Sequence, residues 1–194
     1  MNFLAHIYLS GDDDELKIGN FIADSVKGKS FIKYPVRVQQ GIVLHRAIDT
    51  FTDAHPIFRQ SSQRLFPIYS HYSTVIVDIL YDHFLAANWK DYSSQPLDVY
   101  VQEFYELLQE NLEILPKAVQ RFLPYMMRDN WLLDYATVEG IGRILSQMNR
   151  RTKYRSKMDL AVNELDLYYS DFEAEFKLFF KDLTEFTEQR VKKL

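Results

Sequence analysis

The sequence predicts an all-α protein with one domain, an irregular helical bundle spanning residues 1–194. Apolar residues recur at steps of three and four along most of the chain, and no segment sustains the two-residue alternation of a half-buried strand. Only 6 glycines and 6 prolines interrupt the chain, which favours long helices over a turn-rich sheet structure. Apolar residues make up 47% of the sequence, enough to bury a sizeable core.

Seven helices are expected before the C-terminal region, at residues 15–27, 35–52, 57–66, 70–88, 96–113, 117–129 and 137–149. A proline lies near the start of four of them, where its missing N–H costs little, at Pro35, Pro56, Pro96 and Pro116. Gly11 and the three aspartates after it predict a turn or a helix cap ahead of the first helix.

The C-terminal region predicts one long amphipathic helix. Its apolar stripe recurs at three- and four-residue steps, at Leu165, Tyr169, Phe172, Phe176, Phe179, Leu183 and Phe186. Charged residues fill most of the gaps, so we expect the aromatic stripe to pack into the core.

The absence of cysteine excludes disulfides, thiolate metal sites and a cysteine nucleophile. Any metal must therefore be held by His, Asp, Glu or water. The first residues lack the basic region of a secretory signal, and no apolar stretch is long enough to cross a bilayer. We expect a cytoplasmic protein with no membrane insertion, and nothing in the sequence indicates an oligomeric state.

Basic residues are concentrated in one segment. Residues 140–158 contain no acidic residue and six basic ones, namely Arg143, Arg150, Arg151, Lys153, Arg155 and Lys157. Outside this basic strip, 17 basic residues face 27 acidic ones. An acidic protein with one basic strip is a poor general nucleic-acid binder and a better fit to a single acidic partner.

The spacing of His and Asp on two helices marks a candidate site. His45 and Asp49 are four residues apart, as are Asp78 and Asp82, so each pair shares a helix face. His83 follows Asp82 directly on a strongly apolar helix, where a buried carboxylate is costly unless it is paired or binds a metal. Oxygen and imidazole ligands suit Mn²⁺, Mg²⁺, Fe²⁺ or Zn²⁺.

Spacing alone leaves a second interpretation open. Two aspartates four residues apart often lie on a solvated helix face, and charge pattern by itself favours that interpretation of Asp78 and Asp82. His6 has apolar neighbours, which is typical of a hydrogen-bonded core histidine. Asp24 is equally consistent with a surface acid.

Short motifs around these residues follow one another in a characteristic order. They are Asn2-Phe-Leu-Ala-His6, Gly19-Asn20 with Ala23-Asp24, Gly41-Ile42 with His45-Arg46, Ile48-Asp49 with Thr52-Asp53, Asp78 with Asp82-His83-Phe84-Leu85 and Trp89, and then Leu115-Pro116, Trp131, Ile144-Leu145, Met148 and Arg151. In order and spacing they resemble the bacterial acyl carrier protein phosphodiesterase family over nearly the whole chain.

The resemblance implies an HD-domain-like fold, because that family is a divergent relative of the all-helical His-Asp metal phosphohydrolases. It also implies the hydrolytic release of 4′-phosphopantetheine from the serine of holo acyl carrier protein, usually with Mn²⁺. One departure is the missing adjacent His-Asp pair, since Arg46 follows His45.

The same resemblance suggests roles for individual residues. The expected metal ligands, or groups that orient them, are His6, Asp24, His45, Asp78 and Asp82. Asp49 and His83 are expected as supporting or proton-carrying groups. Arg46 is expected either to bind the phosphate through its guanidinium or to pair with Asp49 or Asp53.

The basic strip is expected to dock the carrier protein, which is small and strongly acidic, although a solvated turn between two helices would have the same composition. Two other functions fit the sequence. One is a His-Asp phosphohydrolase that acts on nucleotides, and the other is a helical module that binds the carrier protein without cleaving it.

Overall fold

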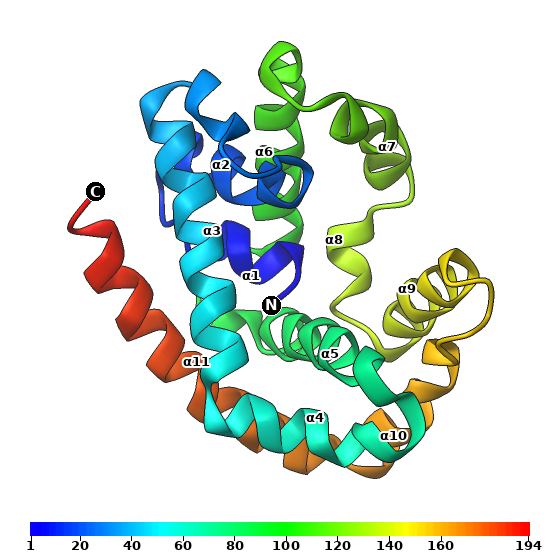
Figure 1. Cartoon of the computed structure of the whole chain (residues 1–194). Helices are drawn as coiled ribbons and strands as arrows, with labels where there is room; N and C mark the ends of the chain where they lie inside the picture. The colour runs from blue at the N-terminus through cyan, green and yellow to red at the C-terminus, as the bar shows by residue number, and fades with distance from the viewer.

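The computed structural model describes all residues from 1 to 194, and it contains eleven α-helices and no strand (Figure 1). The helices are α1 (Phe3–Tyr8), α2 (Asp14–Ile22), α3 (Val36–Ala54), α4 (Pro56–Tyr69), α5 (Ser73–Ala87), α6 (Leu97–Glu110), α7 (Lys117–Arg128), α8 (Trp131–Asp134), α9 (Val138–Arg151), α10 (Val162–Leu167) and α11 (Tyr169–Val191). Short 3₁₀ turns join several of them. The all-α prediction is confirmed.

The seven helices expected upstream correspond to α2–α7 and α9, with ends that differ by a few residues. The first of them ends at Ile22, because Ala23–Ser25 form a separate 3₁₀ turn. The long C-terminal helix begins at Tyr169, not Leu165, since Leu165 belongs to the separate helix α10. Helices α1, α8 and α10 have six residues or fewer and were not predicted.

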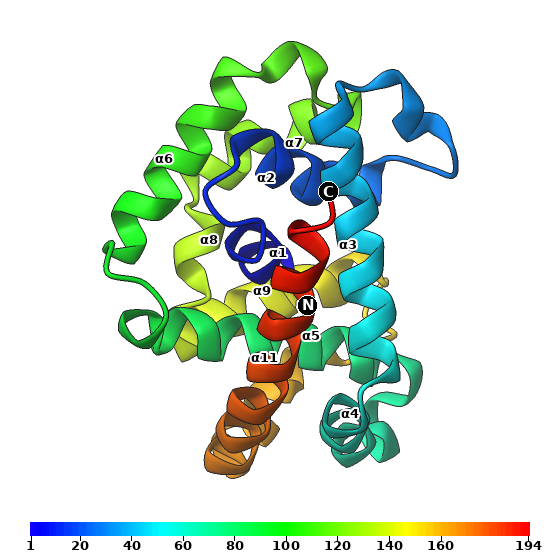
Figure 2. The same cartoon turned by 90° about the vertical axis from the view of Figure 1, so that its left-hand side faces the viewer.

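Helix α11 lies on the outside of the bundle and packs on α3, α4 and α5 (Figure 2). The expected aromatic stripe is buried here, with Phe172, Phe176, Phe179 and Leu183 fully inaccessible to solvent. No helix has the length and apolar character needed to cross a membrane.

Helix α1 lies at the centre of the molecule, and α5 holds its first turn in place (Figure 1). The carboxylate of Asp82 accepts hydrogen bonds from the backbone N–H groups of Asn2 at 3.0 Å and Leu4 at 2.7 Å. These are among the N–H groups that a helix start leaves without an internal partner. A residue eighty positions away thus caps a six-residue helix that would not be stable alone.

Helices α2 and α3 touch backbone to backbone at two glycines. A Cβ atom on Gly19 would lie 2.2 Å from the carbonyl oxygen of Val38, and one on Gly41 would lie 2.5 Å from that of Leu16. Only glycine allows this approach. It brings the C-terminal end of α2, and with it Asn20, against the middle of α3.

We expect Gly19→Ala to lower the free energy of unfolding by about 3 kcal/mol, because the added methyl group forces two backbones apart. Gly142→Ala is the matched control, since the nearest atom to its Cβ would be 3.6 Å away in another side chain. Replacing this helical glycine should be neutral or stabilising by up to about 1 kcal/mol. Urea unfolding measures both, and equal stability of the two variants would contradict the close approach.

Candidate metal centre and adjoining cavity

Two histidines and one aspartate meet between α1 and α3. His6 of α1 and His45 and Asp49 of α3 each offer a ligand atom, and these atoms lie within 4.8 Å of one another. The Nε2 atom of His6 is 3.2 Å from Oδ1 of Asp49, and the Nε2 atom of His45 is 3.1 Å from Oδ2. The two imidazole rings stack with centroids 4.0 Å apart. Both histidines are buried, whereas the Asp49 side chain is 43% exposed.

The side chain of Asn20 determines which way both imidazoles face. Its Nδ2 atom donates to the carbonyl oxygen of His6 at 2.8 Å and to Oγ of Ser10 at 3.0 Å, so its Oδ1 atom is left to accept. That oxygen lies 2.8 Å from Nδ1 of His6 and 3.1 Å from Nδ1 of His45. Both histidines therefore donate from Nδ1 and direct Nε2 at the carboxylates. This is the arrangement that carbonyl oxygens impose on metal-binding histidines.

Electrostatics keep the two rings in different charge states. Burial and the neighbouring His45 lower the pKa of His6 to about 4. Burial also opposes a charge on His45, but its contacts with Asp24 and Asp49 outweigh this and raise its pKa to about 9. Although burial disfavours its charge, the two imidazoles hold the pKa of the Asp49 carboxyl well below its usual range.

These residues fit a divalent cation. The Nε2 atom of His6 is buried without a hydrogen-bond partner, and its lone pair faces an ionised carboxylate oxygen. A cation between nitrogen and oxygen would satisfy both atoms. Imidazole nitrogen together with carboxylate oxygen suits Mn²⁺, Fe²⁺ or Zn²⁺.

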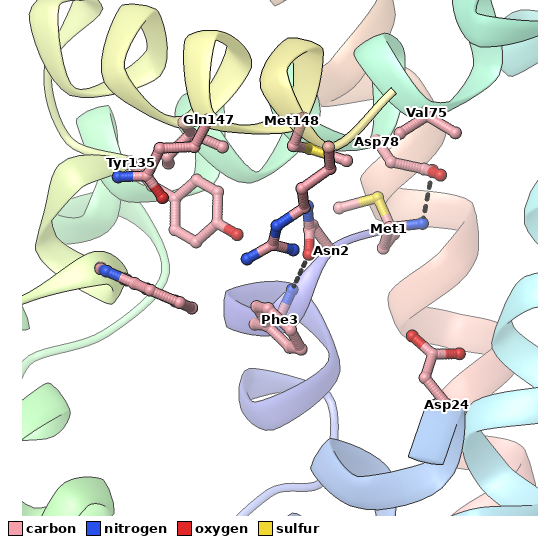
Figure 3. A pocket seen from close by; sticks show the side chains of 12 residues that line it. Met1, Asn2, Phe3, Asp24, Val75, Asp78, Tyr135, Gln147 and Met148 are labelled. Carbon is pink, nitrogen blue, oxygen red and sulfur yellow. Dashed lines mark hydrogen bonds and ion pairs between the residues drawn. The ribbon is translucent and has the colours of Figure 1, made fainter. Parts of the chain in front are cut away.

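Asp24, in the 3₁₀ turn after α2, links this cluster to a cavity. Its Oδ1 atom lies 3.2 Å from Nε2 of His45, and the hydrogen bond to His45 lowers the pKa of the carboxyl. The side chain is 77% exposed and lines a cavity of about 320 Å³. In Figure 3, Asp24 and Asp78 lie on one side of this cavity and Tyr135 on the opposite side. The remaining walls come from the start of α1 and from α5, α8 and α9.

Asp78 and Asp82, the other two expected ligands, are not brought into the cluster of His6, His45 and Asp49. Asp78 lines the cavity, and its Oδ1 atom is 2.6 Å from the amino nitrogen of Met1. Burial raises the pKa of the Asp78 carboxyl. Asp82 caps α1, and burial raises its pKa to about 7. The partners of both carboxylates are nitrogen groups at the start of the chain.

His83 lies on another face of α5 and is also absent from the cluster. Its Nδ1 atom donates to the carbonyl oxygen of Tyr135 at 2.7 Å, and its Nε2 atom is 3.1 Å from the hydroxyl of Tyr169. Burial lowers the pKa of His83. These contacts tie α5 to α8 and α11, and they hold the backbone of Tyr135 at the cavity wall.

The guanidinium of Arg46 contacts the loop that follows Asp24. Its guanidinium donates to the carbonyl oxygens of Val26 at 3.1 Å and Gly28 at 2.9 Å, and it lies over the ring of Phe31. It pairs with neither expected aspartate. Arg46 therefore fastens the loop after Asp24 onto α3, and Arg151 is the arginine that lines the cavity.

The basic strip divides into two parts. Arg143 forms an ion pair with Asp134, which occupies its guanidinium. The other five basic residues are exposed at the end of α9 and in the loop that follows it, namely Arg150, Arg151, Lys153, Arg155 and Lys157. Asn149 orders this loop, since its Oδ1 atom accepts from Ser156 Oγ and from Lys157 N, both at 3.0 Å.

Asn20 was not among the expected site residues, although the Gly19-Asn20 motif contains it. The available signal was a polar side chain among Ile18, Phe21 and Ile22 on an apolar helix, since a buried amide must find hydrogen-bond partners. Trp131, another residue of the family motifs, lines the cavity.

A family comparison agrees with the motifs. The family model described as "Acyl carrier protein phosphodiesterase" matches residues 1–183, which is most of the chain. The chain belongs to the acyl carrier protein phosphodiesterase family. His6, Asn20, Asp24, His45 and Asp49 all lie within the part that this family shares.

Relatives that carry the family name are similar over nearly their whole length. One from Photorhabdus laumondii is 31% identical over 191 residues, 98% of this chain and 96% of the relative. One from Klebsiella pneumoniae strain 342 is 32% identical over 201 residues, 98% and 99% of the two chains. One from Escherichia coli O6:H1 is 31% identical over 189 residues, 95% and 96% of the two chains. No solved structure matches the chain, and its relation to the His-Asp phosphohydrolases stays a prediction.

His83→Gln tests whether His83 contributes to the stability of the folded protein. The pKa of His83 is lowered from the ordinary 6.5, so the imidazole binds a proton more readily in the unfolded chain than in the folded chain. Wild-type protein should therefore lose stability as the pH falls below 6.5. The stability difference between wild type and variant should shrink from pH 7.5 to 5.5 by no more than about 1.4 kcal/mol. Urea unfolding at both pH values measures this, and a constant difference would contradict a neutral buried His83.

Proposed function

We propose that this protein is a metal-dependent phosphodiesterase that hydrolyses holo acyl carrier protein to apo carrier protein and 4′-phosphopantetheine. The observation that carries the proposal is the cluster of His6, His45 and Asp49, oriented by Asn20 beside a cavity, in a chain of this family. Mn²⁺ is the first metal to test, and Mg²⁺, Fe²⁺ and Zn²⁺ are the alternatives.

The two histidines and Asp49 would hold the cation. A bound divalent cation neutralises phosphate charge and makes its water more acidic. Asn20 keeps a proton on each Nδ1 atom, so both Nε2 atoms face Asp49. The Nε2 lone pair of His6 is free, and a cation would bind His45 by displacing the proton from its Nε2 atom. Asp49 is ionised over the whole neutral range and balances the added charge.

Two further residues contribute groups from the cavity side. Asp24 is an exposed carboxylate beside His45, and its lowered pKa leaves it ionised and able to orient a water proton. Arg151 lines the cavity and forms no ion pair, so its guanidinium is available to the phosphate. The oxygen of water then bonds to phosphorus as the bond to the serine oxygen breaks, and the serine leaves with a proton.

Holo acyl carrier protein incubated with the purified enzyme and Mn²⁺ should lose the mass of its prosthetic group. Removal of the metal with a chelator should stop the reaction, and added Mn²⁺ should restore it. We expect His45→Ala and Asp49→Ala to lower kcat/KM on the order of a thousand-fold, the effect of losing several kcal/mol of charge stabilisation. Mass spectrometry of the carrier protein measures the product.

His71→Ala is the matched control, because His71 is exposed and outside the cluster. Metal content measured on the same variants should fall only for His45→Ala and Asp49→Ala. Unchanged hydrolysis in these two variants would contradict the site. Cleavage of nucleotides in place of the carrier protein would favour a nucleotide phosphohydrolase, and binding of the carrier protein without cleavage or metal would favour a non-catalytic module.

We infer that the exposed part of the basic strip docks the acidic carrier protein. Arg151 belongs both to the strip and to the cavity wall, so a partner bound to the strip lies beside the site. The loop is held by Asn149, which lets its basic side chains present a defined charge pattern.

Arg150→Glu combined with Arg151→Glu should raise KM for the carrier protein by about tenfold at low salt and flatten its dependence on ionic strength. Lys192→Glu with Lys193→Glu is the control, since it makes the same charge change at the end of α11. Steady-state kinetics at several salt concentrations separate the two. An equal effect of both double variants would indicate that the strip acts only through the net charge of the protein.

A further inference from the structure

A second hollow of the molecule is an open groove of about 500 Å³ between α7 and α9. Helix α8 joins these two helices and packs against both, and the three follow one another down the right-hand side of Figure 1. Three residues line both this groove and the cavity beside the candidate metal centre, namely Trp131, Gln147 and Arg151. A partner bound in the groove would therefore lie directly beside that cavity.

Three aromatic side chains line the groove. Phe122 and Tyr125 are three residues apart on α7 and so share one face of that helix. The ring of Trp131, the first residue of α8, stacks on that of Phe122 with centroids 6.0 Å apart. Phe122 and Trp131 are half-buried and Tyr125 is 55% exposed, so this aromatic surface is partly open to solvent. Aromatic residues that share one open groove are typical of protein interfaces.

Unpaired positive charge lies on the α9 side of the groove. Arg150 and Arg151 line it from the last turn of α9, both are exposed, and neither guanidinium forms an ion pair. The one carboxylate at the groove is that of Asp129, which accepts two hydrogen bonds of 2.6 and 2.8 Å from Arg128. The groove thus combines an apolar surface with free cations, which complements a partner that carries apolar and acidic side chains together.

We propose that this groove docks an acidic amphipathic helix of a partner protein, with one bulky apolar side chain against Tyr125 and Trp131 and carboxylates at Arg150. A groove between two helices can bind the apolar face of a third. The inference rests on the proposed function, under which the docked helix belongs to the acyl carrier protein. It goes beyond the docking role of the basic strip, because it adds an apolar anchor that fixes where the partner lies. Exposed cations speed the encounter of two proteins, whereas a few packed aromatic residues supply most of the affinity.

Calorimetric titration with apo acyl carrier protein measures this docking without cleavage, because the apo protein lacks the prosthetic group. Tyr125→Ser should raise the Kd by about tenfold, the effect of losing an aromatic anchor. Tyr125→Phe keeps the ring and should bind within about twofold of wild type. Leu178→Ser is the matched control, since it removes a similarly exposed apolar side chain (60%) from α11 and should leave the Kd unchanged.

Ionic strength separates the apolar anchor from the charges. Salt screens exposed charges but not apolar contacts, so the effect of Tyr125→Ser should persist at about 0.5 M salt, where that of Arg150→Glu should largely disappear. An unchanged Kd for Tyr125→Ser, or an equal rise for Leu178→Ser, would overturn the proposal. A dimer of this protein that Tyr125→Ser dissociates, without binding of the carrier protein, would assign the groove to a second copy and overturn it too.

The titration is independent of catalysis. If the wild-type protein binds the apo carrier protein through Tyr125 but cleaves no holo protein, the proposed function fails and the groove stands as the docking site of a binding module. If holo protein is cleaved and Tyr125→Ser binds the apo protein like wild type, the proposed function stands and the groove docks no partner helix.

Discussion

The carboxamide of Asn20 sets the protonation pattern on which the candidate metal centre depends. Its nitrogen is committed to the carbonyl oxygen of His6 and to Ser10, so its oxygen must accept from both imidazoles. Without this constraint either ring could rotate or change tautomer, and the two Nε2 atoms would no longer face Asp49 together. The amide can act on both rings only because Gly19 and Gly41 let α2 and α3 approach so closely.

Helical periodicity was enough to predict most of the fold, because long amphipathic helices such as α3 and α6 carry their own signal in sequence. The helices that it missed are short and depend on contacts from elsewhere. Helix α1 is capped by Asp82 of α5. Leu132, in the four-residue helix α8, donates its backbone N–H to the hydroxyl of Tyr105. No local pattern encodes such long-range partners, so their sequences do not show that they are helical.

The candidate site, like the fold, was predicted where the signal is local in the sequence and missed where it depends on long-range contacts. Helix spacing and family motifs together pointed to His6, Asp24, His45 and Asp49, and the fold places these four side by side. The apolar surroundings of Asp82 correctly indicated that its carboxylate needs a partner. That partner is a row of backbone N–H groups, whose position depends on tertiary packing. Whether a metal binds stays a prediction, because the donor atoms describe a suitable site without identifying its occupant.

The cap on α1 has a consequence for how the protein is made. His6, Asn20 and His45 leave the ribosome early, yet the helix that carries His6 has only six residues, too few to persist alone. Its cap is Asp82, which emerges tens of residues later in synthesis. Since chains elongate at about 5–20 residues per second, the nascent chain passes through an interval of seconds with its histidines present but unassembled. The cluster of His6, His45 and Asp49 is therefore complete only after α5 has been translated and docked.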